Sequence, residues 1–368
     1  MRKLAALAAT TLLAISCGQG SGSSSSHSPS PSARASTGAS PSSGPTTNPG
    51  ASSYGLLLTA GTLDLVAPNG SVGPTATVAA PSVQSCGQGA GAVVQPPVSA
   101  SADKIYFRDG DTKIRYITPS RQTGDATTVP GSATLISFFS VSPDDQRIAV
   151  VVEDLSAAST ISLRLYVEDL SGGGHHADIY TTTTPKGKSG TTLWPMGWHQ
   201  GLLVLALVTA CTVEPAGLSP SEWHVSDAVT AARRVTISGN CILSYWPSPA
   251  GVACVDNGTN LQATAYDWTG KVTASIPVTS SDYQSGLSPS GAHFFFATGQ
   301  GIGASAPATR VFTVGAGQAG GTVAGHSACL FIDESHLLAP DAVIASPSGA
   351  VTPLPASGIC AGRFPGGL

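Results

Sequence analysis

The sequence predicts an all-β protein, and three observations support this fold class. Charged residues make up only 10% of the chain, against about 25% in ordinary soluble domains. Glycine, serine, threonine and valine take their place, and these residues favour turns and strands over helices. From residue 54 onward, short apolar runs alternate with turn sequences that contain Ser-Pro or glycine, which is the pattern of strands joined by tight turns.

The chain begins with the pattern of an export signal. Residues 1–3 are Met-Arg-Lys, and the largely apolar run 4–15 that follows is too short to span a bilayer core of about 30 Å. Residues 13–17 read Leu-Ala-Ile-Ser-Cys, which resembles the lipobox of bacterial lipoproteins. The resemblance implies cleavage after residue 16 and attachment of a diacylglycerol to the thiol of Cys17. Ordinary secretion with cleavage nearby is the alternative.

Three segments are expected on this basis: a lipoprotein signal peptide over 1–16, a flexible linker over 17–53 and a folded domain over 54–368. The linker is almost entirely Ser, Gly, Pro, Thr and Ala, so it cannot bury enough apolar surface to offset its ordering entropy. We expect a disordered N-terminal stalk with a root-mean-square span on the order of 30 Å. The lipid would hold the protein in the cell envelope, on the extracytoplasmic side of the membrane.

Charge and cysteine content exclude several kinds of partner. The formal net charge is −4, and it becomes −6 once Arg2 and Lys3 leave with the signal peptide. This balance argues against nucleic acid, whose phosphates require basic patches. Six cysteines follow Cys17, which permits three disulfides of open pairing: Cys86, Cys211, Cys241, Cys254, Cys329 and Cys360. None of their spacings is that of a zinc site, and we expect neither a metal nor a cofactor.

A repeated unit determines the expected architecture. Residues 139–151 contain a strand, the turn Ser-Pro-Asp-Asp and a second strand, and residues 163–173 contain a third strand that ends in Ser-Gly-Gly. This resembles the repeat of TolB-type, WD40-like β-propellers. The same pattern returns in weaker form over 246–254, 265–272, 287–297 and 343–351.

The spacing of these units predicts a β-propeller of seven four-stranded blades, with six or eight blades as alternatives, because the period of about 40 to 45 residues is the propeller value. The expected blades cover 54–83, 92–130, 134–182, 191–238, 241–279, 283–323 and 325–357. The first unit lacks an innermost strand, and a ring without open edges needs one. We therefore predict that residues 359–364 complete blade 1, which would place Cys360 where Cys241 and Cys329 lie in their own blades.

The loops and the aromatic residues suggest where a ligand would bind. Long connections fall on one expected face of the ring, over 81–92, 154–160, 182–190, 211–221 and 299–308, and loops on a rigid scaffold often carry function. Five aromatic residues of blade 4 are candidate ligand-face residues: Trp194, Trp198, His199, Trp223 and His224. A stacking platform needs exposed rings. Packing between blades is the favoured alternative, because large aromatics are mostly buried.

Two short motifs carry weaker signals for chemistry. Residues 325–329 resemble the nucleophile elbow of serine hydrolases, but that elbow requires a strand-to-helix turn, and no helical pattern follows Ser327. His175 and His176 could bind a metal, yet adjacent residues in a strand point to opposite sides. A solvated turn is the better interpretation of the two histidines.

The leading functional hypothesis is therefore a binding or scaffolding module for a protein, peptidoglycan or glycan partner. TolB-like proteins are periplasmic and contact other envelope proteins, so the resemblance implies a similar role without assigning contact residues. The alternative is a propeller enzyme such as a glycosidase, lyase or quinoprotein, since the fold alone does not determine function. Two carboxylates or two histidines facing each other across the channel would favour the enzyme; a mouth lined by Thr, Ser and apolar groups would count against it.

Overall fold

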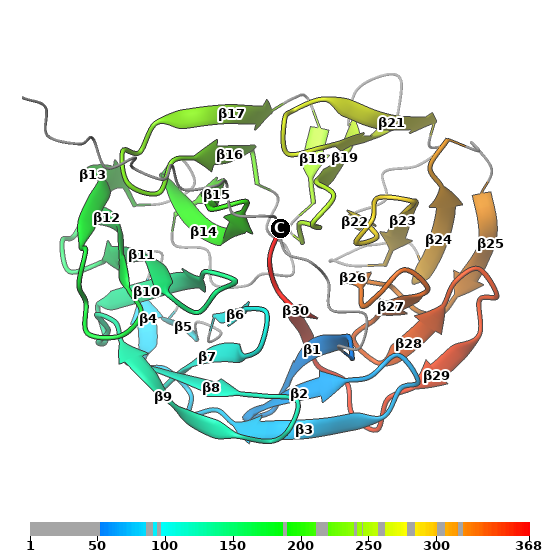
Figure 1. Cartoon of the computed structure of the whole chain (residues 1–368), viewed down its shortest axis with the longest axis horizontal. Helices are drawn as coiled ribbons and strands as arrows, with labels where there is room; N and C mark the ends of the chain where they lie inside the picture. The colour runs from blue at the N-terminus through cyan, green and yellow to red at the C-terminus, as the bar shows by residue number, and fades with distance from the viewer. Residues whose placement is uncertain are drawn as a thin grey trace, which may run out of the picture. The chain divides into compact units, whose positions relative to one another are not determined.

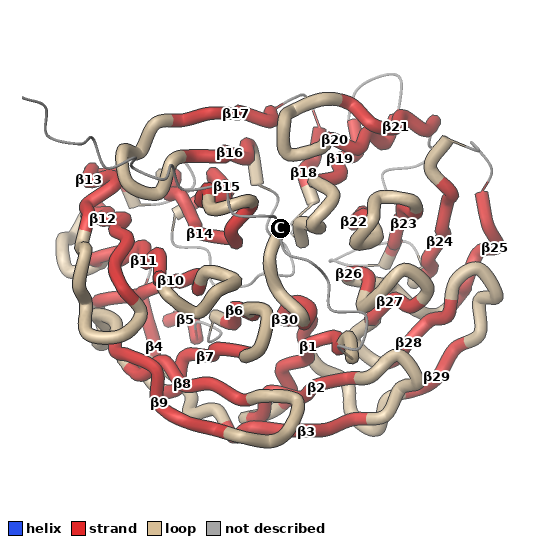
Figure 2. The backbone as a smooth tube through the Cα atoms, viewed as in Figure 1, coloured by secondary structure: helices blue, strands red, loops and turns tan. Residues whose placement is uncertain are grey.

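The structure, a computed structural model, shows seven four-stranded antiparallel sheets arranged as the blades of a ring (Figure 1). It describes residues 52–368 except 86–90, 94–96, 187–189, 211–219, 239–240, 245, 257–261, 278–283, 300–305 and 316–318. Within these residues every element is a strand, as Figure 2 shows. The predicted all-β class and the seven-bladed propeller are confirmed. The signal peptide, Cys17 and most of the expected stalk lie outside the described residues.

The strands of each blade are given from the centre of the ring outward. Blade 1 contains β30 (Ile359–Phe364), β1 (Tyr54–Thr59), β2 (Thr62–Val66) and β3 (Val72–Thr77). Blade 2 contains β6 (Val98–Ala100), β7 (Ile105–Asp109), β8 (Lys113–Ile117) and β9 (Thr123–Thr128). Blade 3 contains β10 (Leu135–Val141), β11 (Arg147–Asp154), β12 (Thr160–Asp169) and β13 (Ala177–Pro185). Blade 4 contains β14 (Thr191–His199), β15 (Leu202–Thr209), β16 (Glu222–Ser226) and β17 (Arg233–Ser238).

The remaining three blades follow the same order. Blade 5 contains β18 (Cys241–Leu243), β19 (Val252–Asp256), β20 (Gln262–Tyr266) and β21 (Val272–Pro277). Blade 6 contains β22 (Gln284–Leu287), β23 (His293–Thr298), β24 (Ala308–Thr313) and β25 (Ala319–Ala324). Blade 7 contains β26 (Leu330–Phe331), β27 (His336–Leu338), β28 (Ala342–Ala345) and β29 (Val351–Pro353).

Blade 2 differs from its expected range of 92–130. Its innermost strand begins at Val98, and the connection from blade 1 forms a separate two-stranded sheet of β4 (Val83–Ser85) and β5 (Gly91–Val93). Val83 pairs with Val93 in this hairpin, so the residues around 92 pair with each other and not with β7. Blade 4, by contrast, runs from Thr191 to Ser238 as predicted.

The Ser-Pro turns form as their sequences predict. In blade 3 the N–H of Asp145 donates to the carbonyl of Ser142 at 3.0 Å, and the N–H of Arg147 donates to Ser142 Oγ at 2.9 Å. Asp145 has a φ of 60°, in the left-handed region that Asp tolerates better than most residues. In blade 6 the N–H of Gly291 donates to the carbonyl of Ser288 at 2.9 Å. One turn chemistry therefore joins the first two strands in different blades.

The core lies between the blades. Central strands are covered on both sides, so β11 is buried at six consecutive positions, whereas the outer strand β9 alternates between exposed and half-buried residues. Phe138 of blade 3 stacks on Trp194 of blade 4 with ring centroids 4.0 Å apart. Phe295 of blade 6 meets Phe331 of blade 7 edge to face at 5.6 Å. The ring is therefore held together by apolar side chains that fill the wedge between adjacent sheets.

The ring closes through blade 1, as predicted. Strand β30, which spans Ile359–Phe364, pairs with β1 in antiparallel register, with Tyr54 opposite Phe364 and Leu58 opposite Ile359. A disulfide joins Cys360 of β30 to Cys329, the residue before β26 of blade 7. The two ends of the propeller are thus connected both by hydrogen bonds and by a covalent bond.

The two faces of the ring carry different connections. The turns from the first to the second strand of each blade, and from the third to the fourth, lie on one face, called here the short-turn face. The second-to-third and blade-to-blade connections lie on the opposite, long-loop face. Because Tyr54 lies opposite Phe364 at the short-turn end of blade 1, the chain enters the ring, and leaves it after β30, on the short-turn face. Figure 1 shows the C-terminal end at the centre of the ring.

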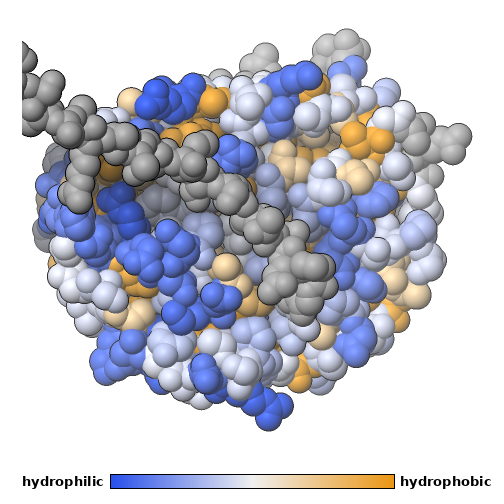
Figure 3. All heavy atoms as spheres, viewed as in Figure 1, coloured by the Kyte–Doolittle hydropathy of each residue, from blue (hydrophilic) through white to orange (hydrophobic). Residues whose placement is uncertain are grey.

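In the space-filling view, the visible described surface mixes hydrophilic residues with small separate hydrophobic areas (Figure 3). Across the described residues, three large hydrophobic side chains are exposed: Val72, Val229 and Val272. A search of the described residues finds no helix with the length and hydropathy needed to cross a membrane.

Candidate binding site at the mouth of the central channel

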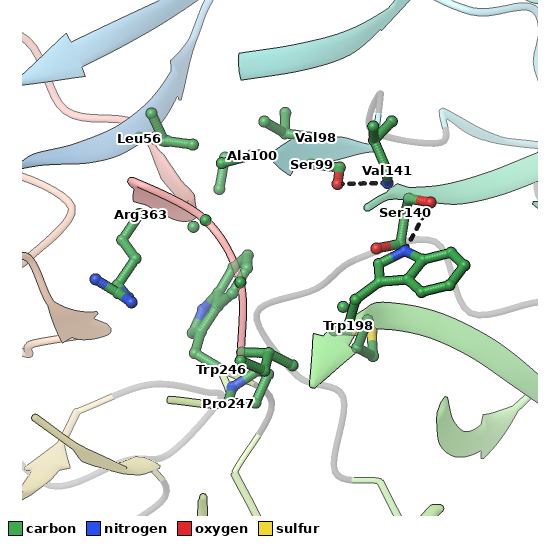
Figure 4. Close-up of a pocket in the computed structure, with 17 residues that line it drawn as sticks. Leu56, Val98, Ser99, Ala100, Ser140, Val141, Trp198, Trp246, Pro247 and Arg363 are labelled. Carbon is green, nitrogen blue, oxygen red and sulfur yellow. Dashed lines mark hydrogen bonds between the residues drawn. The ribbon is translucent and has the colours of Figure 1, made fainter. Parts of the chain in front are cut away.

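A cavity of about 80 Å³ lies in the central channel, near the short-turn face. Its wall is formed by the short-turn ends of the innermost strands of blades 1 to 4, together with Trp246 and Pro247 of blade 5 (Figure 4). The lining is mostly apolar, with Leu56, Val98 and Val141 among its members. Loops 81–92, 182–190, 211–221 and 299–308 lie partly outside the described residues, so their expected role stays a prediction. The cavity itself lies near the opposite, short-turn face.

Residues 366–368 cross the mouth of this cavity, and they all line it. The N–H of Gly366 donates to the carbonyl of Ser101 in blade 2 at 2.7 Å, and the N–H of Leu368 donates to the carbonyl of Trp198 in blade 4 at 2.8 Å. Nδ1 of His199 lies 2.7 Å from the carbonyl oxygen of Leu368, to which it donates. The segment therefore binds two blades through its backbone, as an added peptide would.

Two glycines permit this close approach. A Cβ atom at Gly366 would lie 1.8 Å from the carbonyl oxygen of Ala100, and one at Gly197 would lie 2.5 Å from Cδ1 of Leu368. Real Cβ atoms do not come this close to other heavy atoms. A larger residue at Gly366 would therefore push the segment away from the backbone of Ala100, whereas one at Gly197 would require the Leu368 side chain to move. The glycine-rich sequence Pro-Gly-Gly-Leu at 365–368 thus suits a backbone that lies against other backbone.

Most polar groups of the wall already have partners. Nε1 of Trp198 donates to the carbonyl of Ser140 at 3.3 Å, and Ser99 Oγ accepts the N–H of Val141 at 2.9 Å, both drawn in Figure 4. These bonds fix the indole of Trp198 and the end of β6 against blade 3. The wall is consequently preformed, which reduces the entropy lost on binding.

Arg363 is the exception, and it is the only charged residue among the described lining residues. No hydrogen bond or ion pair engages its guanidinium within the part of the chain that the structure describes. Burial lowers the pKa of this guanidinium to about 10, and the negative charge of Glu334 opposes the shift. Glu334 itself accepts hydrogen bonds from the N–H and the hydroxyl of Ser290 at 2.6 and 2.7 Å. In Figure 4, Arg363 extends from β30 with no dashed line to its nitrogens.

Most of the candidate ligand-face aromatics lie inside the blade interfaces. Trp194 is 3% exposed, stacks on Phe138 and donates from Nε1 to Glu153 Oε1 at 3.1 Å. Trp223 is fully buried and meets Trp268 edge to face. Large rings fill the wedges between sheets here, which is the packing arrangement that the sequence analysis favours.

Two of the candidates reach the mouth. Trp198 belongs to the cavity wall, and half-buried His199 contacts Leu368. Burial lowers the pKa of His199, so it is mostly neutral at pH 7 and can donate from Nδ1 to the carbonyl of Leu368. His224 is buried beside Glu222, away from the cavity lining. The five candidates therefore divide between packing and the site.

The structure assigns one complete disulfide, Cys329–Cys360, and places Cys254 in a disulfide as well. Cys86, Cys211 and the side chain of Cys241 lie outside the described residues. The cysteines that can be placed therefore serve as covalent links.

The two weaker motifs are structural. Ser327 Oγ donates to the carbonyl of Thr298, and His326 Nδ1 lies 3.1 Å from Asp341, so residues 325–329 join blades 6 and 7 and form no nucleophile elbow. His176 lies in a surface cluster with Glu168 at 2.7 Å and Asp178 at 3.3 Å. Among the described side chains, no group of His, Cys, Asp and Glu has the arrangement of a metal site.

The chain was also compared with known proteins. No family model matches the chain, and no curated protein matches it. Among solved structures, an oligogalacturonate lyase from Vibrio parahaemolyticus is 10% identical over 77% of this chain and 79% of its own, with a TM-score of 0.48. TolB from Acinetobacter baumannii is 15% identical over 71% and 61%, with a TM-score of 0.40. The β-propeller domain of the Trilobed protease from Pyrococcus furiosus is 9% identical over 80% and 87%, with a TM-score of 0.45.

The sequence analysis missed two parts of this site, Arg363 and the segment 366–368. The prediction that β30 completes blade 1 already places Arg363 on the innermost strand, beside the channel. It does not place the residues that follow, because their position depends on where blades 2 and 4 lie relative to blade 1. The available signal was an arginine followed by Pro-Gly-Gly at the end of a closing strand.

Proposed function

We propose that this protein is a lipid-anchored β-propeller on the extracytoplasmic side of the membrane and that it binds another envelope protein. The partner would contribute an extended segment that binds at the mouth of the central channel. One observation carries the proposal: the mouth holds residues 366–368 of this chain through the carbonyls of Ser101 and Trp198 and the side chain of His199. A surface that binds one peptide backbone in this way offers the same groups to another.

The chemistry of the mouth favours a peptide over a glycan. Sugar rings stack on exposed aromatic faces, whereas Trp194 and Trp223 are buried between sheets. The mouth instead offers backbone carbonyls, a histidine N–H and an apolar wall, which are groups that bind peptide backbone and small apolar side chains. The membrane anchor rests on the lipobox-like sequence before Cys17 and on the Ser- and Gly-rich linker that follows it.

A crosslinking pull-down from intact envelopes tests both parts of this proposal. The wild-type chain is compared with Cys17→Ala and with a chain that lacks residues 366–368. We expect the wild type to capture a reproducible partner and the shortened chain to capture more of it, because the mouth is open. An excess of the peptide Phe-Pro-Gly-Gly-Leu should reduce the capture in both. The variant Arg310→Gln, on an exposed position of β24, serves as the control.

Each part can fail separately. If Cys17→Ala remains in the membrane fraction and the wild-type chain has the mass of an unmodified protein, the lipid anchor is wrong. If the peptide and the deletion leave capture unchanged, the partner binds elsewhere on the ring.

A further inference from the structure

Arg363 is a half-buried arginine that lines the central cavity. In the described part of the molecule no hydrogen bond or ion pair reaches its guanidinium. A charged group that lies partly inside the protein loses some of its hydration, and here no group of the described chain replaces it. A position of this kind is typical of a residue whose partner is a ligand.

Arg108 is fully buried, and its surroundings differ from those of Arg363. Arg108 is 1% exposed and packs between blades 2 and 3, where Nη1 donates to the carbonyl of Ser137 at 2.9 Å. Arg108 is therefore held inside a blade interface through Nη1, although its Nε and Nη2 have no hydrogen-bond partner among the described residues. Arg363 is only half-buried, and it lines a cavity that a ligand can enter.

We propose that the central cavity binds a carboxylate group through Arg363, and that the peptide segment expected at the mouth carries this carboxylate on an acidic side chain. The planar guanidinium presents paired N–H groups that match the two oxygens of a carboxylate. About 10–15 Å³ on this measure holds one water, so a cavity of about 80 Å³ accommodates a group of several atoms. The apolar lining around Arg363 strengthens such a charged hydrogen bond because it lowers the local dielectric.

The position of residues 366–368 explains how the segment and the cavity are coupled. Gly366, Gly367 and Leu368 line the same cavity that Arg363 lines, so a segment bound at the mouth and this arginine border one space. In this chain the segment contains no acidic residue. A competing segment with the same backbone and one added carboxylate would make the mouth contacts and would pair with Arg363 as well. It would therefore displace residues 366–368.

Isothermal titration of the full chain in detergent tests the proposal, which rests on the proposed function for the peptide source of the carboxylate. The probes are the peptide Gly-Asp-Gly-Gly-Leu and its counterpart Gly-Asn-Gly-Gly-Leu, both acetylated and amidated at their ends so that the Asp side chain is their only carboxylate, and acetate. We expect the acidic peptide to bind about tenfold or more tightly than the neutral one, as a charge-assisted hydrogen bond predicts. This preference should disappear in Arg363→Gln, should be weaker but present in Arg363→Lys, and should persist in the control Arg310→Gln.

Other outcomes of these titrations would also support or overturn the carboxylate site at Arg363. Binding of acetate that requires Arg363, with no preference between the two peptides, supports the carboxylate site and assigns it to a small free carboxylate. Equal binding of both peptides together with no binding of acetate overturns the site, as does a preference that survives in a folded Arg363→Gln chain. The titrations are repeated on the chain without residues 366–368, so that failure of all probes to bind this open form also overturns the proposal. A failed pull-down alone would contradict the proposed function and leave the preference for carboxylate measurable.

Discussion

His224 is 2% exposed and lies beside the carboxylate of Glu222, with Arg233 bound to the same carboxylate. Burial lowers the pKa of this histidine, and the charge of Arg233 lowers it further, while Glu222 opposes the shift. The neutral form is therefore favoured in the folded protein. Above the unfolded pKa of about 6.5 both states are neutral and stability is complete. As the pH falls below this value, the unfolded state takes up a proton first and the folded state loses stability.

We expect His224→Gln to flatten this pH dependence. The free energy of unfolding, measured by urea titration at pH 5 and pH 7.5, should fall less on acidification in the variant than in the wild type, because Gln cannot be protonated. An unchanged slope between the two pH values would mean that other groups control acid stability.

His176 should act in the opposite direction. Its hydrogen bond to Glu168 raises its pKa, with a smaller contribution from Asp178, and burial opposes the shift. The stabilisation is therefore complete below the unfolded pKa of about 6.5 and is lost as the pH rises through the folded value. The side chain is 35% exposed, so solvent screening limits the effect of His176→Gln to at most about 1 kcal/mol at pH 6. The same urea titrations should detect no difference at pH 9.

For single residues, the sequence predicts which chemical groups are present better than it predicts where their side chains lie in the fold. The low content of charged residues, and the absence of a zinc spacing, can be read directly from the chain. The division of five aromatic residues between packing and the mouth cannot be read in this way, because a β-bulge between Pro195 and Gly197 interrupts the two-residue period and only one of the two strand tryptophans, Trp198, lines the cavity.

At the scale of single turns and strands, Gly251 lies where the first turn of blade 5 closely approaches the end of β20, the third strand of the blade. Its φ is 141°, and a Cβ atom there would lie 1.8 Å from the carbonyl oxygen of Tyr266. Gly201 has a φ of 80° but open space around the position of its Cβ. Both glycines have conformations that other residues adopt with strain, but only one of them also faces a clash.

We expect Gly251→Ala to lower the free energy of unfolding by about 3 kcal/mol or more, because backbone strain and overpacking add. The control Gly201→Ala should lose only about 1–2 kcal/mol from strain alone. Guanidinium titration of both variants measures the difference. Equal losses would show that the turn of blade 5 moves away from β20 without cost.

The closing element can be tested through its disulfide. Cys329 and Cys360 are separated by 31 residues and join blade 7 to blade 1. For a loop of this length, chain entropy predicts that the bond stabilises the folded state by about 3 to 4 kcal/mol. Cys329→Ala, Cys360→Ala and the double variant should all lose this amount in guanidinium titrations. A loss in the double variant of less than about 1 kcal/mol would mean that the β1–β30 pairing closes the ring by itself.

The strands and turns were the most predictable part of this structure. Ser-Pro turns and alternating strands are local features, so the extent of blade 4 follows from short stretches of sequence. The position of β30 follows instead from the need of a closed ring for an innermost strand in blade 1. The start of blade 2 was missed because residues 91–93 are as suitable for a strand as 98–100, and only the partner available to each decides where it pairs.

On the scale of the whole molecule, residues 366–368 close the mouth through a small number of hydrogen bonds. Deleting them should cost at most about 1 kcal/mol per net hydrogen bond lost and should expose Trp198 and Trp246, both of which line the cavity. We therefore expect acrylamide to quench tryptophan fluorescence more strongly in the shortened chain, with a loss of stability of at most about 3 kcal/mol for the three hydrogen bonds. Identical Stern–Volmer slopes for the two chains would show that the segment does not close the mouth in solution.

The seven-bladed ring could be predicted because similar strand-and-turn units recur in the sequence about every 40 to 45 residues. The cavity could not, because its wall takes residues from five blades and its size depends on how the innermost strands converge. Arg363 illustrates the limit: its strand was assigned correctly, but the lack of a partner for its charge is a property of the assembled channel.

The pairing of Tyr54 with Phe364 has a mechanical consequence for a protein held by its N-terminal end. Tension on the segment before Tyr54 acts on the end of a strand that is paired on both sides, with β2 and with β30. The load is therefore shared between two rows of hydrogen bonds, and β30 is fixed to the neighbouring blade by the Cys329–Cys360 bond. In the proposed anchored state, the point of attachment and the mouth also belong to the same face, so a partner that binds there would be drawn toward the membrane.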